Sequence, residues 1–343
     1  MKTILITGGA GYIGSHAVKL MLDNDYHVVV FDNLFRGYKE ALDILSDYSD
    51  KNKKGKLSFF KGDLTNINDI EECFSNYKIE GVLHFAALCL VSESMSEPEK
   101  YFHNNTYGSL NLLKVMQSQN VKNIIFSSTC AVYGESQYLP LDEKHPTNPS
   151  NPYGESKLLT ERILKWFGEI YGFNYTILRY FNICGSNKDG LIGDSKKPSQ
   201  LLLQNAVRGA MNIEKFYLTC PQVDTPDGTP IRDYIDVEDL VNAHLLAYKN
   251  LEALKDTESF REIINLGNGK GWSVKEIVTE VEKIFNIKIN ATQGETRKGE
   301  YAHVYANNTK AKEMLKWTPQ KSLKDSVESL QKWYEKYPNG YSY

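Results

Sequence analysis

Residues 3–14 read Thr-Ile-Leu-Ile-Thr-Gly-Gly-Ala-Gly-Tyr-Ile-Gly, an apolar run followed at once by a glycine-rich turn. The apolar run predicts a buried strand, and the residues from Tyr12 onward predict a helix. In such a unit Gly8 permits a tight turn, Gly11 permits close approach of the backbone to a diphosphate, and Gly14 permits close helix–strand packing. The diphosphate would lie at the N-terminus of the helix. This stretch therefore predicts a dinucleotide-binding α/β fold.

Two acidic residues follow later apolar runs. Asp32 ends the run 28–32, about twenty residues after the glycines, where a carboxylate can accept hydrogen bonds from ribose hydroxyls. A 2′-phosphate would be repelled there, so the sequence favours NAD over NADP, although Arg36 is near enough to weaken that preference slightly. Asp63 follows the run 57–60. It could meet the adenine amino group or cap the next helix.

Short apolar runs recur along the first half of the chain, with amphipathic stretches between them. This pattern predicts parallel strands buried on both faces, in a Rossmann-like doubly wound α/β sheet with a smaller C-terminal substrate lobe. We expect residues 1–182 to form the dinucleotide domain, with 233–262 returning to it, and residues 183–232 and 263–343 to form the lobe. The predicted strands are 4–7, 28–32, 57–60, 82–86, 123–127 and 176–179.

Composition points to a small-molecule partner. The 343 residues include 40 basic and 43 acidic side chains, so the formal net charge of −3 favours neither nucleic acid nor an anionic membrane. Five cysteines, an odd number without Cys-x-x-Cys spacing, predict reduced thiols in a cytoplasmic protein and no metal site. No stretch approaches the 18 apolar residues typical of a membrane span.

A tyrosine and a lysine, Tyr153 and Lys157, stand four residues apart in Asn-Pro-Tyr-Gly-Glu-Ser-Lys and would share one face of a helix. A phenol is a useful base near pH 7 if its pKa falls by about three units, roughly 4 kcal/mol. One ammonium at about 4 Å in an effective dielectric of ~20 supplies about that much. Thr129 ends a predicted strand and could bind a substrate hydroxyl beside the phenol. The three residues predict nicotinamide chemistry with a tyrosine base.

Several ordered motifs together resemble the extended short-chain dehydrogenase/reductase family, and within it the nucleotide-sugar 4-epimerases of the UDP-glucose 4-epimerase type. The resemblance covers essentially the whole chain. The motifs are Thr-Gly-Gly-Ala-Gly-Tyr-Ile-Gly-Ser-His (7–16), His-Phe-Ala-Ala (84–87), Phe-Ser-Ser-Thr (126–129), Asn-Pro-Tyr-Gly-Glu-Ser-Lys (151–157), Leu-Arg-Tyr-Phe-Asn (178–182) and Asp-Gly-Thr-Pro-Ile-Arg-Asp-Tyr-Ile (227–235).

The resemblance implies three groups of site residues. Thr129, Tyr153 and Lys157 would be catalytic, and Thr129 and Tyr153 would also contact the sugar. Tightly bound, recycled NAD would contact Gly8, Gly11, Tyr12, Ile13, Gly14, Asp32, Asn33, Asp63, Leu64, Phe85, Ala86, Ala87, Asn104, Tyr153, Lys157 and Phe181. A UDP-sugar would contact Asn182, Arg232, Arg297 and Glu300, with the arginines near the uracil ribose and the diphosphate.

The implied reaction is hydride transfer from sugar C4 to NAD while ionised Tyr153 takes the O4 proton. The resulting 4-keto sugar would turn over and receive the hydride on its opposite face. Dehydratase-like relatives carry an acidic residue or an Asp-Glu pair directly after the threonine, for proton transfers at C5 and the leaving hydroxyl. Here these positions are Cys130 and Ala131, so elimination is disfavoured.

Two departures bear on the substrate. Cys89 stands where hexose epimerases usually carry a lysine near the cofactor, and Arg297-Lys298-Gly299-Glu300 carries glutamate where an aspartate is usual. Val304 occupies the position that often gates the sugar pocket, and this small residue leaves room for an N-acetyl group or is simply core. UDP-glucose/UDP-galactose interconversion is the main expectation, with UDP-xylose/UDP-arabinose or UDP-N-acetylhexosamine 4-epimerisation as alternatives.

Two readings from other classes are a non-catalytic NAD-binding module and a net-redox dehydrogenase. The intact Thr129, Tyr153 and Lys157 disfavour the module, and independence from added coenzyme would disfavour the dehydrogenase. By the resemblance, helices around 105–119 and 158–171 would pair across a two-fold axis to form a homodimer. Their apolar faces could equally be covered by the chain's own sheet.

Overall fold

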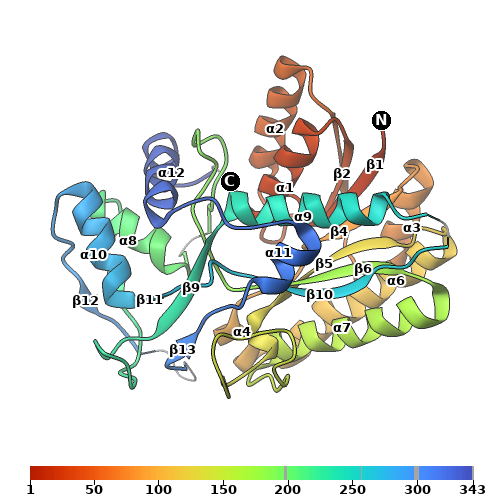
Figure 1. The fold of residues 1–343 in the computed structure, drawn as a ribbon. Coiled ribbons are helices and arrows are strands. Elements are labelled where there is room, and N and C mark those ends of the chain that lie inside the picture. The colour runs from red at the N-terminus through yellow and green to blue at the C-terminus, as the bar shows by residue number, and fades with distance from the viewer. Residues whose placement is uncertain (197–198, 256, 297–300, 342–343) are drawn as a thin grey trace. The chain divides into compact units, whose positions relative to one another are not determined.

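A computed structural model describes residues 1–196, 199–255, 257–296 and 301–341 of the chain. Its backbone contacts divide the chain into two compact units (Figure 1). The first unit comprises residues 1–134, 146–179 and 241–264, and the second comprises 135–145, 180–240 and 265–343.

A seven-stranded sheet forms the centre of the first unit. Its strand order is β10-β6-β5-β4-β1-β2-β3, and β1 pairs in parallel with both β2 and β4. The order of the six strands β1–β6 is that of dinucleotide-binding sheets, so the predicted doubly wound α/β fold is confirmed. The strands are β1 (Thr3–Thr7), β2 (His27–Asp32), β3 (Lys56–Lys61), β4 (Gly81–His84), β5 (Asn123–Thr129), β6 (Asn174–Tyr180) and β10 (Arg261–Leu266).

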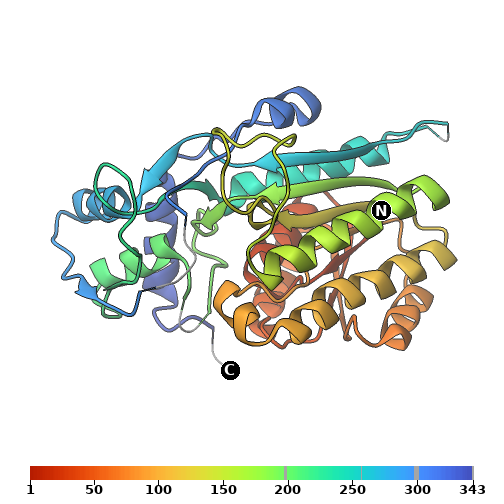
Figure 2. The ribbon, with the colours of Figure 1, turned by 90° about the horizontal axis from the view of Figure 1, so that it is seen from below.

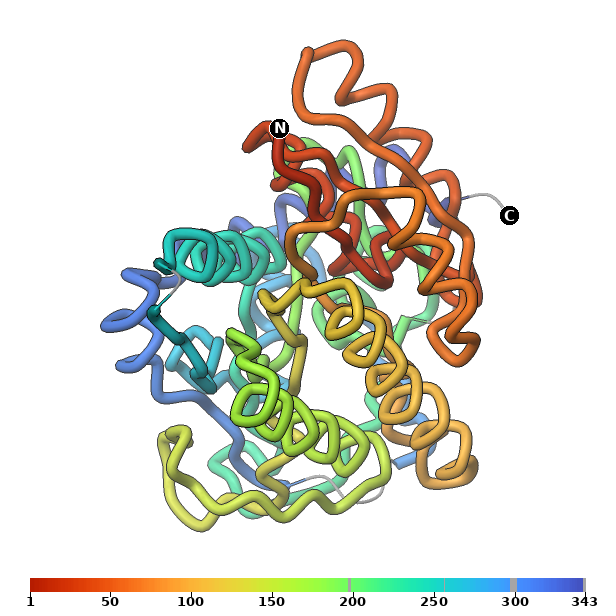
Figure 3. The backbone as a smooth tube through the Cα atoms, turned by 90° about the vertical axis from the view of Figure 1, so that its right-hand side faces the viewer, coloured from red at the N-terminus to blue at the C-terminus, as the bar shows by residue number. Residues whose placement is uncertain are grey.

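Helices connect these strands and cover the sheet. Among them, α6 packs against both α3 and α7, and α6 and α7 run side by side in Figures 2 and 3. The helices are α1 (Tyr12–Asp23), α2 (Lys39–Asn52), α3 (Ile67–Asn76), α4 (Val91–Ser96), α5 (Pro98–Tyr101), the π-helix η1 (Phe102–Tyr107), α6 (Gly108–Ser118), the 3-10 helix η2 (Cys130–Val132), α7 (Pro152–Tyr171) and α9 (Val237–Glu252).

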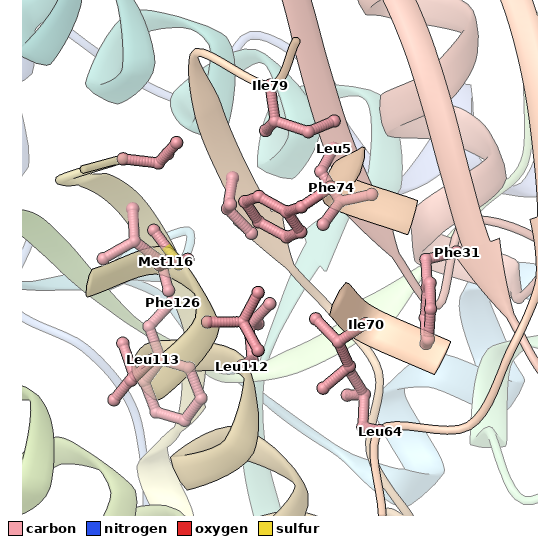
Figure 4. Close-up of a cluster of buried hydrophobic side chains, with 14 of the residues drawn as sticks. Leu5, Phe31, Leu64, Ile70, Phe74, Ile79, Leu112, Leu113, Met116 and Phe126 are labelled. Atoms are coloured by element: carbon pink, nitrogen blue, oxygen red, sulfur yellow. The ribbon is translucent and has the colours of Figure 1, made fainter. Parts of the chain in front are cut away.

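The core of the first unit lies between the sheet and the layer formed by α3, α6 and α7 (Figure 4). Leu5 of β1 and Phe126 of β5 meet Ile70 and Leu112 from the helices within this cluster. Ile4, the neighbour of Leu5, points to the opposite face of the sheet and is also fully buried. Burial on both faces explains why the strands are continuous apolar runs in the sequence.

Among its described residues, the second unit contains two small sheets and four helices. Strand β9 lies between β11 and β13 and also pairs with β7 in parallel, while β8 and β12 form a separate pair. The strands are β7 (Asn182–Cys184), β8 (Tyr217–Leu218), β9 (Ile231–Asp236), β11 (Gly271–Ser273), β12 (Thr292–Gln293) and β13 (His303–Val304). The helices are α8 (Leu202–Ala210), α10 (Val274–Phe285), α11 (Thr309–Leu315) and α12 (Leu323–Lys336).

The boundaries of the compact units differ in detail from the expected domains 1–182, 183–232, 233–262 and 263–343. The first unit ends at Arg179 and resumes at Val241, and residues 135–145 belong to the second unit. The last difference has a local cause. Leu141 donates a backbone hydrogen bond to Tyr305 and accepts one from Asn307, at 2.9 and 2.7 Å. Within the described part of the chain, no helix has the length and apolar character needed to cross a membrane.

Candidate active site

The glycine turn after β1 has the backbone geometry of a phosphate cradle. Gly8 has φ +71°, and a Cβ atom placed there would lie 2.7 Å from the nitrogen of Ala86. A Cβ atom at Gly14 would lie 2.1 Å from the carbonyl oxygen of Gly8. Gly11 is the N-cap of α1 and has no side chain to cap the helix. The first-turn N–H groups of α1 therefore suit an anionic ligand, and the residues present fit a dinucleotide diphosphate.

Asp32 is fixed beside this turn. Ala10 N donates to its Oδ2 at 3.0 Å, and Leu34 N donates to its Oδ1 at 2.8 Å. The side chain is 8% exposed, and burial raises the pKa of Asp32 despite these two hydrogen bonds. Both oxygens keep acceptor capacity for ribose hydroxyls, because a carboxylate oxygen can accept more than one hydrogen bond.

Asp63 lies next to this position and is not a helix cap. Asn33 Nδ2 donates to Asp63 Oδ2 at 2.9 Å, and the backbone N–H of Thr65 donates to Oδ1 at 2.8 Å. Burial opposes ionisation, but these hydrogen bonds outweigh it and place the pKa of Asp63 below its usual value. The cap of α3 is Asn66, whose side chain accepts from Asn68 N. Asp63 thus stays a candidate adenine contact rather than a capping residue.

The segment after β4 is hydrogen-bonded to the end of β1, next to the glycine turn. Phe85 N donates to the Thr7 carbonyl at 3.1 Å, and Thr7 Oγ1 accepts from Ala86 N at 3.3 Å. His84 lies between Thr7 Oγ1 and Ser109 Oγ at 2.7 and 2.8 Å, and burial lowers the pKa of His84 to about 3. A neutral imidazole therefore holds the ends of β1 and β4 together.

The remaining predicted cofactor residues of this unit surround the same edge of the sheet. Tyr12 begins α1 and packs edge-on against His16, and the Phe85 ring stacks on His244 at 4.8 Å. Asn104 lies in the π-helix and donates to Asn105. Ile13 lies in the first turn of α1, Leu64 follows Asp63 and is 8% exposed, and Ala87 follows Ala86.

Thr129, Tyr153 and Lys157 come together at the end of β5. Asn151 caps α7 by accepting from Gly154 N at 2.8 Å, which sets the first turn that carries Tyr153. The Thr129 hydroxyl is hydrogen-bonded to the Tyr153 phenol. Lys157 Nζ donates to the carbonyl of Ser127 at 2.8 Å and lies 4.9 Å from the centroid of the Phe126 ring. A strand end and the first turn of a helix thus position all three side chains.

The pKa values of Tyr153 and Lys157 differ from those expected from the spacing of the two residues alone. Burial raises the pKa of Tyr153, and the hydrogen bond from Thr129 opposes that rise only in part. Burial lowers the pKa of Lys157 to about 8, while Cys89 and Glu161 act in the opposite direction. In the protein alone the pKa of Tyr153 therefore rises instead of falling as expected, because burial removes water from around the phenol.

Two supporting residues were not found from the sequence. Glu161, one turn after Lys157, is fully buried and accepts two hydrogen bonds from Arg179 at 2.9 and 2.6 Å, and one from Ser128 Oγ at 2.5 Å. Asn105 binds the backbone of Leu88 in both directions at 2.8 and 2.9 Å and also donates to Ser156. The sequence signal for Glu161 was its helical spacing from Lys157. Asn105 gave no such signal.

In the second unit, predicted substrate residues share one face of a sheet. Asn182 pairs with Tyr234 in register, and Arg232 precedes Tyr234 by two residues, so Asn182 and Arg232 lie on the same face. Val304 and Trp272 are the direct neighbours of Arg232 on β13 and β11. Trp272, with Lys270 Nζ 4.0 Å from its ring, was missed in the sequence.

The predicted cofactor contact Phe181 also belongs to the second unit. Phe181 N donates to the Leu266 carbonyl at 3.2 Å. Arg297 and Glu300 lie outside the described residues. Among the described residues, no cluster of three or more His, Cys, Asp or Glu side chains could hold a metal ion.

The strand order, the glycine turn and the Thr129, Tyr153 and Lys157 group define a Rossmann-fold protein with the active-site pattern of a short-chain dehydrogenase/reductase. A family model described as GDP-mannose 4,6 dehydratase matches residues 5–330. The chain belongs to this family, and its curated relatives include UDP-glucose 4-epimerases, as the sequence resemblance predicts.

Three comparisons illustrate the similarity. The UDP-glucose 4-epimerase of Halalkalibacterium halodurans is 41% identical over 341 residues, which is 99% of this chain and 97% of that protein. Putative UDP-arabinose 4-epimerase 2 of Arabidopsis thaliana is 39% identical over 345 residues, 98% of this chain and 81% of that protein. The crystal structure of UDP-glucose 4-epimerase from Bifidobacterium longum in complex with NAD+ and UDP has a TM-score of 0.90 and 35% identity, covering 99% of this chain and 100% of that one.

Proposed function

We propose that this chain is a NAD-dependent UDP-sugar 4-epimerase that interconverts UDP-glucose and UDP-galactose. The observation that carries the proposal is the grouping of Thr129, Tyr153 and Lys157 at the carboxyl edge of the sheet, the edge that also carries the glycine turn. The residues after the threonine, Cys130 and Ala131, lack the carboxyl group that dehydratase-like relatives use for the acid and base steps of elimination. Relatives named UDP-glucose 4-epimerase support the assignment.

Each group of this site has a proposed role. Bound NAD supplies a reversible hydride acceptor and donor. Tyr153 takes the proton of the sugar O4 hydroxyl and returns it after the sugar has turned over. Thr129 holds that hydroxyl and donates to the phenolate. Lys157, fixed by Ser127, places a positive charge beneath the reacting groups. Glu161 favours the charged form of Lys157.

We also infer a division of labour between the two units. The first carries the residues that fit NAD apart from Phe181, and the second would carry the UDP-sugar contacts Asn182, Arg232, Arg297 and Glu300. Arg232 suits a diphosphate because a guanidinium donates paired hydrogen bonds. The expected division into a dinucleotide domain and a substrate lobe remains part of this proposal.

A second candidate function is 4-epimerisation of UDP-arabinose and UDP-xylose. Two observations favour it: the Arabidopsis relative is nearly as similar as the bacterial ones, and Val304 is a small residue directly beside Arg232. The same small residue leaves room for an N-acetyl group, so UDP-N-acetylhexosamines belong in the same test.

A homodimer built on α6 and α7 is part of the proposal. Trp166 and Ile170, one turn apart on α7, are 63% and 65% exposed, and Tyr171 and Tyr107 are each 45% exposed. Three of these exposed side chains lie on α7, and such a group of large apolar side chains favours a protein interface. Trp166→Glu should convert the dimer to a monomer in light scattering, whereas an unchanged mass would remove this face from the interface.

We further propose a cytoplasmic protein without a nucleic-acid partner. The balanced charge supports the absence of a nucleic-acid partner. Cys73 and Cys184, both buried thiols, fit a reducing compartment.

The decisive experiment incubates the purified full-length chain with each UDP-sugar and no added coenzyme, and reads the products by NMR. UDP-galactose should convert to UDP-glucose, and Tyr153→Phe should be inactive under the same conditions. Preference for UDP-arabinose would select the second candidate. A requirement for stoichiometric added NAD(P)H would refute the epimerase assignment in favour of a net-redox dehydrogenase.

A further inference from the structure

An ion pair in the first unit links two loops at the carboxyl edge of the sheet. Arg36, in the loop between β2 and α2, donates through Nη2 to Glu93 Oε2 of α4 at 2.5 Å. The two side chains are 26% and 21% exposed. The pair is therefore partly shielded from water, and its strength is less reduced by screening than that of a fully exposed pair.

The sheet topology places this link across the mouth of the dinucleotide site. Arg36 follows β2 and Glu93 follows β4, and β1 lies between these two strands. Neighbouring strands are about 4.8 Å apart, so the two loops start about 10 Å from each other. The glycine turn, Gly8–Gly14, leaves the sheet between them. The Arg36–Glu93 pair thus joins the two loops that lie on either side of the glycine turn.

The loop that carries Arg36 lies directly against that cradle. Tyr38 N donates to the carbonyl of Ala10 at 3.0 Å. A Cβ atom placed on Gly37 would lie 2.7 Å from Cβ of Ala10, so no larger residue fits there. The residues on the C-terminal side of Arg36 are consequently held on the glycine turn. Arg36 therefore lies near the N-terminus of α1, where a phosphate would bind.

Arg36 itself carries an unused donor. Its Nη1 atom is covered from solvent and has no hydrogen-bond partner among the residues that the structure describes. A buried donor without a partner costs free energy, which a nearby anionic ligand would offset. This observation is independent of the ion pair and points to an anion beside the guanidinium.

Glu93 is held in place to receive Arg36. Its carboxylate also accepts from the Tyr101 hydroxyl at 2.6 Å and from Lys100 Nζ at 2.9 Å. Burial opposes ionisation of Glu93, but its hydrogen bonds outweigh burial and lower its pKa to about 2. Tyr101 is fully buried, and its ring packs edge-on against Tyr153 at 6.4 Å between centroids. One rigid group thus connects the bridge to the catalytic tyrosine.

We propose that Arg36 and Glu93 form a clasp over the dinucleotide site, in which Glu93 orients Arg36 toward the cofactor diphosphate and the closed pair slows cofactor release. This inference rests on the proposed NAD-dependent function. Arg36 and Glu93 are positioning residues, since the chemistry belongs to Tyr153 and its neighbours. Slow cofactor release suits the proposed reaction, because the hydride taken from the sugar can return to it only if the reduced cofactor stays bound until the end of the cycle.

The test measures retention of NAD by the purified full-length chain. Bound NAD is quantified after gel filtration, and its release is followed by exchange with excess isotopically labelled NAD. Arg36→Gln and Glu93→Gln should each speed release by about tenfold or more, the effect of losing a hydrogen bond between charged groups. The double variant should release NAD no faster than the single variants, because the two residues act as one unit.

The matched control is Glu97→Gln. Glu97 lies on the same segment and pairs with Lys100 at 3.4 Å, and its side chain is 53% exposed. Its release rate should equal that of the unaltered chain. Additive effects of Arg36→Gln and Glu93→Gln, or unchanged release in either, would overturn the clasp.

A second arm separates two phosphate sources. Binding of NAD and of NADP to cofactor-free protein is compared in the unaltered chain and in Arg36→Gln. Weaker NAD binding in the variant supports contact with the diphosphate. A loss confined to NADP would assign Arg36 to a 2′-phosphate and overturn the proposal. If the unaltered chain bound no NAD at all, the proposed function itself would fail, a result distinct from either outcome.

Discussion

The glycine turn allows one substitution, glycine to alanine, to be tested at two sites where the expected loss of stability differs in size. At Gly14 the new Cβ atom would lie 2.1 Å from the Gly8 carbonyl oxygen and 2.8 Å from the backbone of Gly9. At Gly11 its nearest neighbour, the same oxygen, is 3.3 Å away, and the backbone angles of φ −82° and ψ 176° suit any residue. Only the first substitution therefore forces the backbone to move.

The expected energies follow from these distances. Gly14→Ala should cost about 3 kcal/mol, since overpacking of a close contact costs 1–3 kcal/mol and this contact is with rigid backbone. Gly11→Ala should cost about 1 kcal/mol or less, the effect of a poorer helix N-cap. In a unit of this size 1 kcal/mol corresponds to about 2–4 °C in Tm. We therefore expect Gly14→Ala to melt about 6–12 °C lower and Gly11→Ala at most about 4 °C lower.

The assay is thermal unfolding of cofactor-free protein, repeated with saturating NAD. The unaltered chain should gain stability from NAD by mass action. Gly11→Ala should fold but lose most of that gain, because its methyl group would occupy the path of the diphosphate. Equal melting of Gly14→Ala and Gly11→Ala without NAD would refute the packing argument. Full stabilisation of Gly11→Ala by NAD would refute the phosphate cradle.

Three further results are expected. Tyr153→Phe should lower turnover roughly 10²–10⁴-fold, the usual contribution of a general base, with unchanged NAD content; normal turnover would remove Tyr153 from its role. Glu161→Gln should destabilise the first unit by about 3–5 kcal/mol in urea unfolding, because Arg179 stays buried without its partner; wild-type stability would contradict this. Burial raises the pKa of Asp236 to about 7, so its neutral form stabilises the fold at low pH and this stabilisation is lost as pH rises toward 7. Asp236→Asn should reduce the stability loss between pH 5 and pH 8 by about 3 kcal/mol, and an unchanged pH dependence would exclude Asp236 as its source.

The central strands could be predicted because each is buried on both faces. That burial selects uninterrupted apolar runs such as Val28–Phe31, whose limits lie within a residue or two of the observed strand. The glycine turn was equally readable, since Gly8 and Gly14 occupy positions where a side chain meets backbone. The local sequence was sufficient to predict these features because one requirement, burial or close backbone contact, determines the residue type at each position.

Other features depend on partners distant in the sequence and left no local pattern. The helix expected from Asn105 begins instead as a π-helix over Phe102–Tyr107, where Asn105 turns inward to bind Leu88 and Ser156. Its two polar partners lie 17 and 51 residues away, so periodicity could not reveal them. Widened helical turns of this kind occur frequently at functional sites. The bridge between Arg36 and Glu93 was hidden for the same reason.

The pKa of Tyr153 shows a different limit of sequence reasoning. The spacing to Lys157 correctly placed both residues on the first turns of α7. The spacing could not show that Lys157 Nζ donates a hydrogen bond to the Ser127 carbonyl, or that protein surrounds the phenol of Tyr153. Desolvation is a property of the folded site, and here it is the largest cause of the shift in the pKa of Tyr153.

The segment after Thr129 explains how a family that includes dehydratases can carry an epimerase site. Thr129 Oγ1 accepts from Ala131 N at 3.2 Å, which ties the hydroxyl to the first turn of η2. A Cβ atom on Gly154 would lie 2.7 Å from the Ala131 carbonyl oxygen, so this turn packs directly on the residue after Tyr153. In this chain the segment therefore sets the distance between the threonine hydroxyl and the phenol. It supplies no acidic group, since Cys130 and Ala131 follow Thr129, and this agrees with the proposed proton exchange between Tyr153 and the sugar hydroxyl.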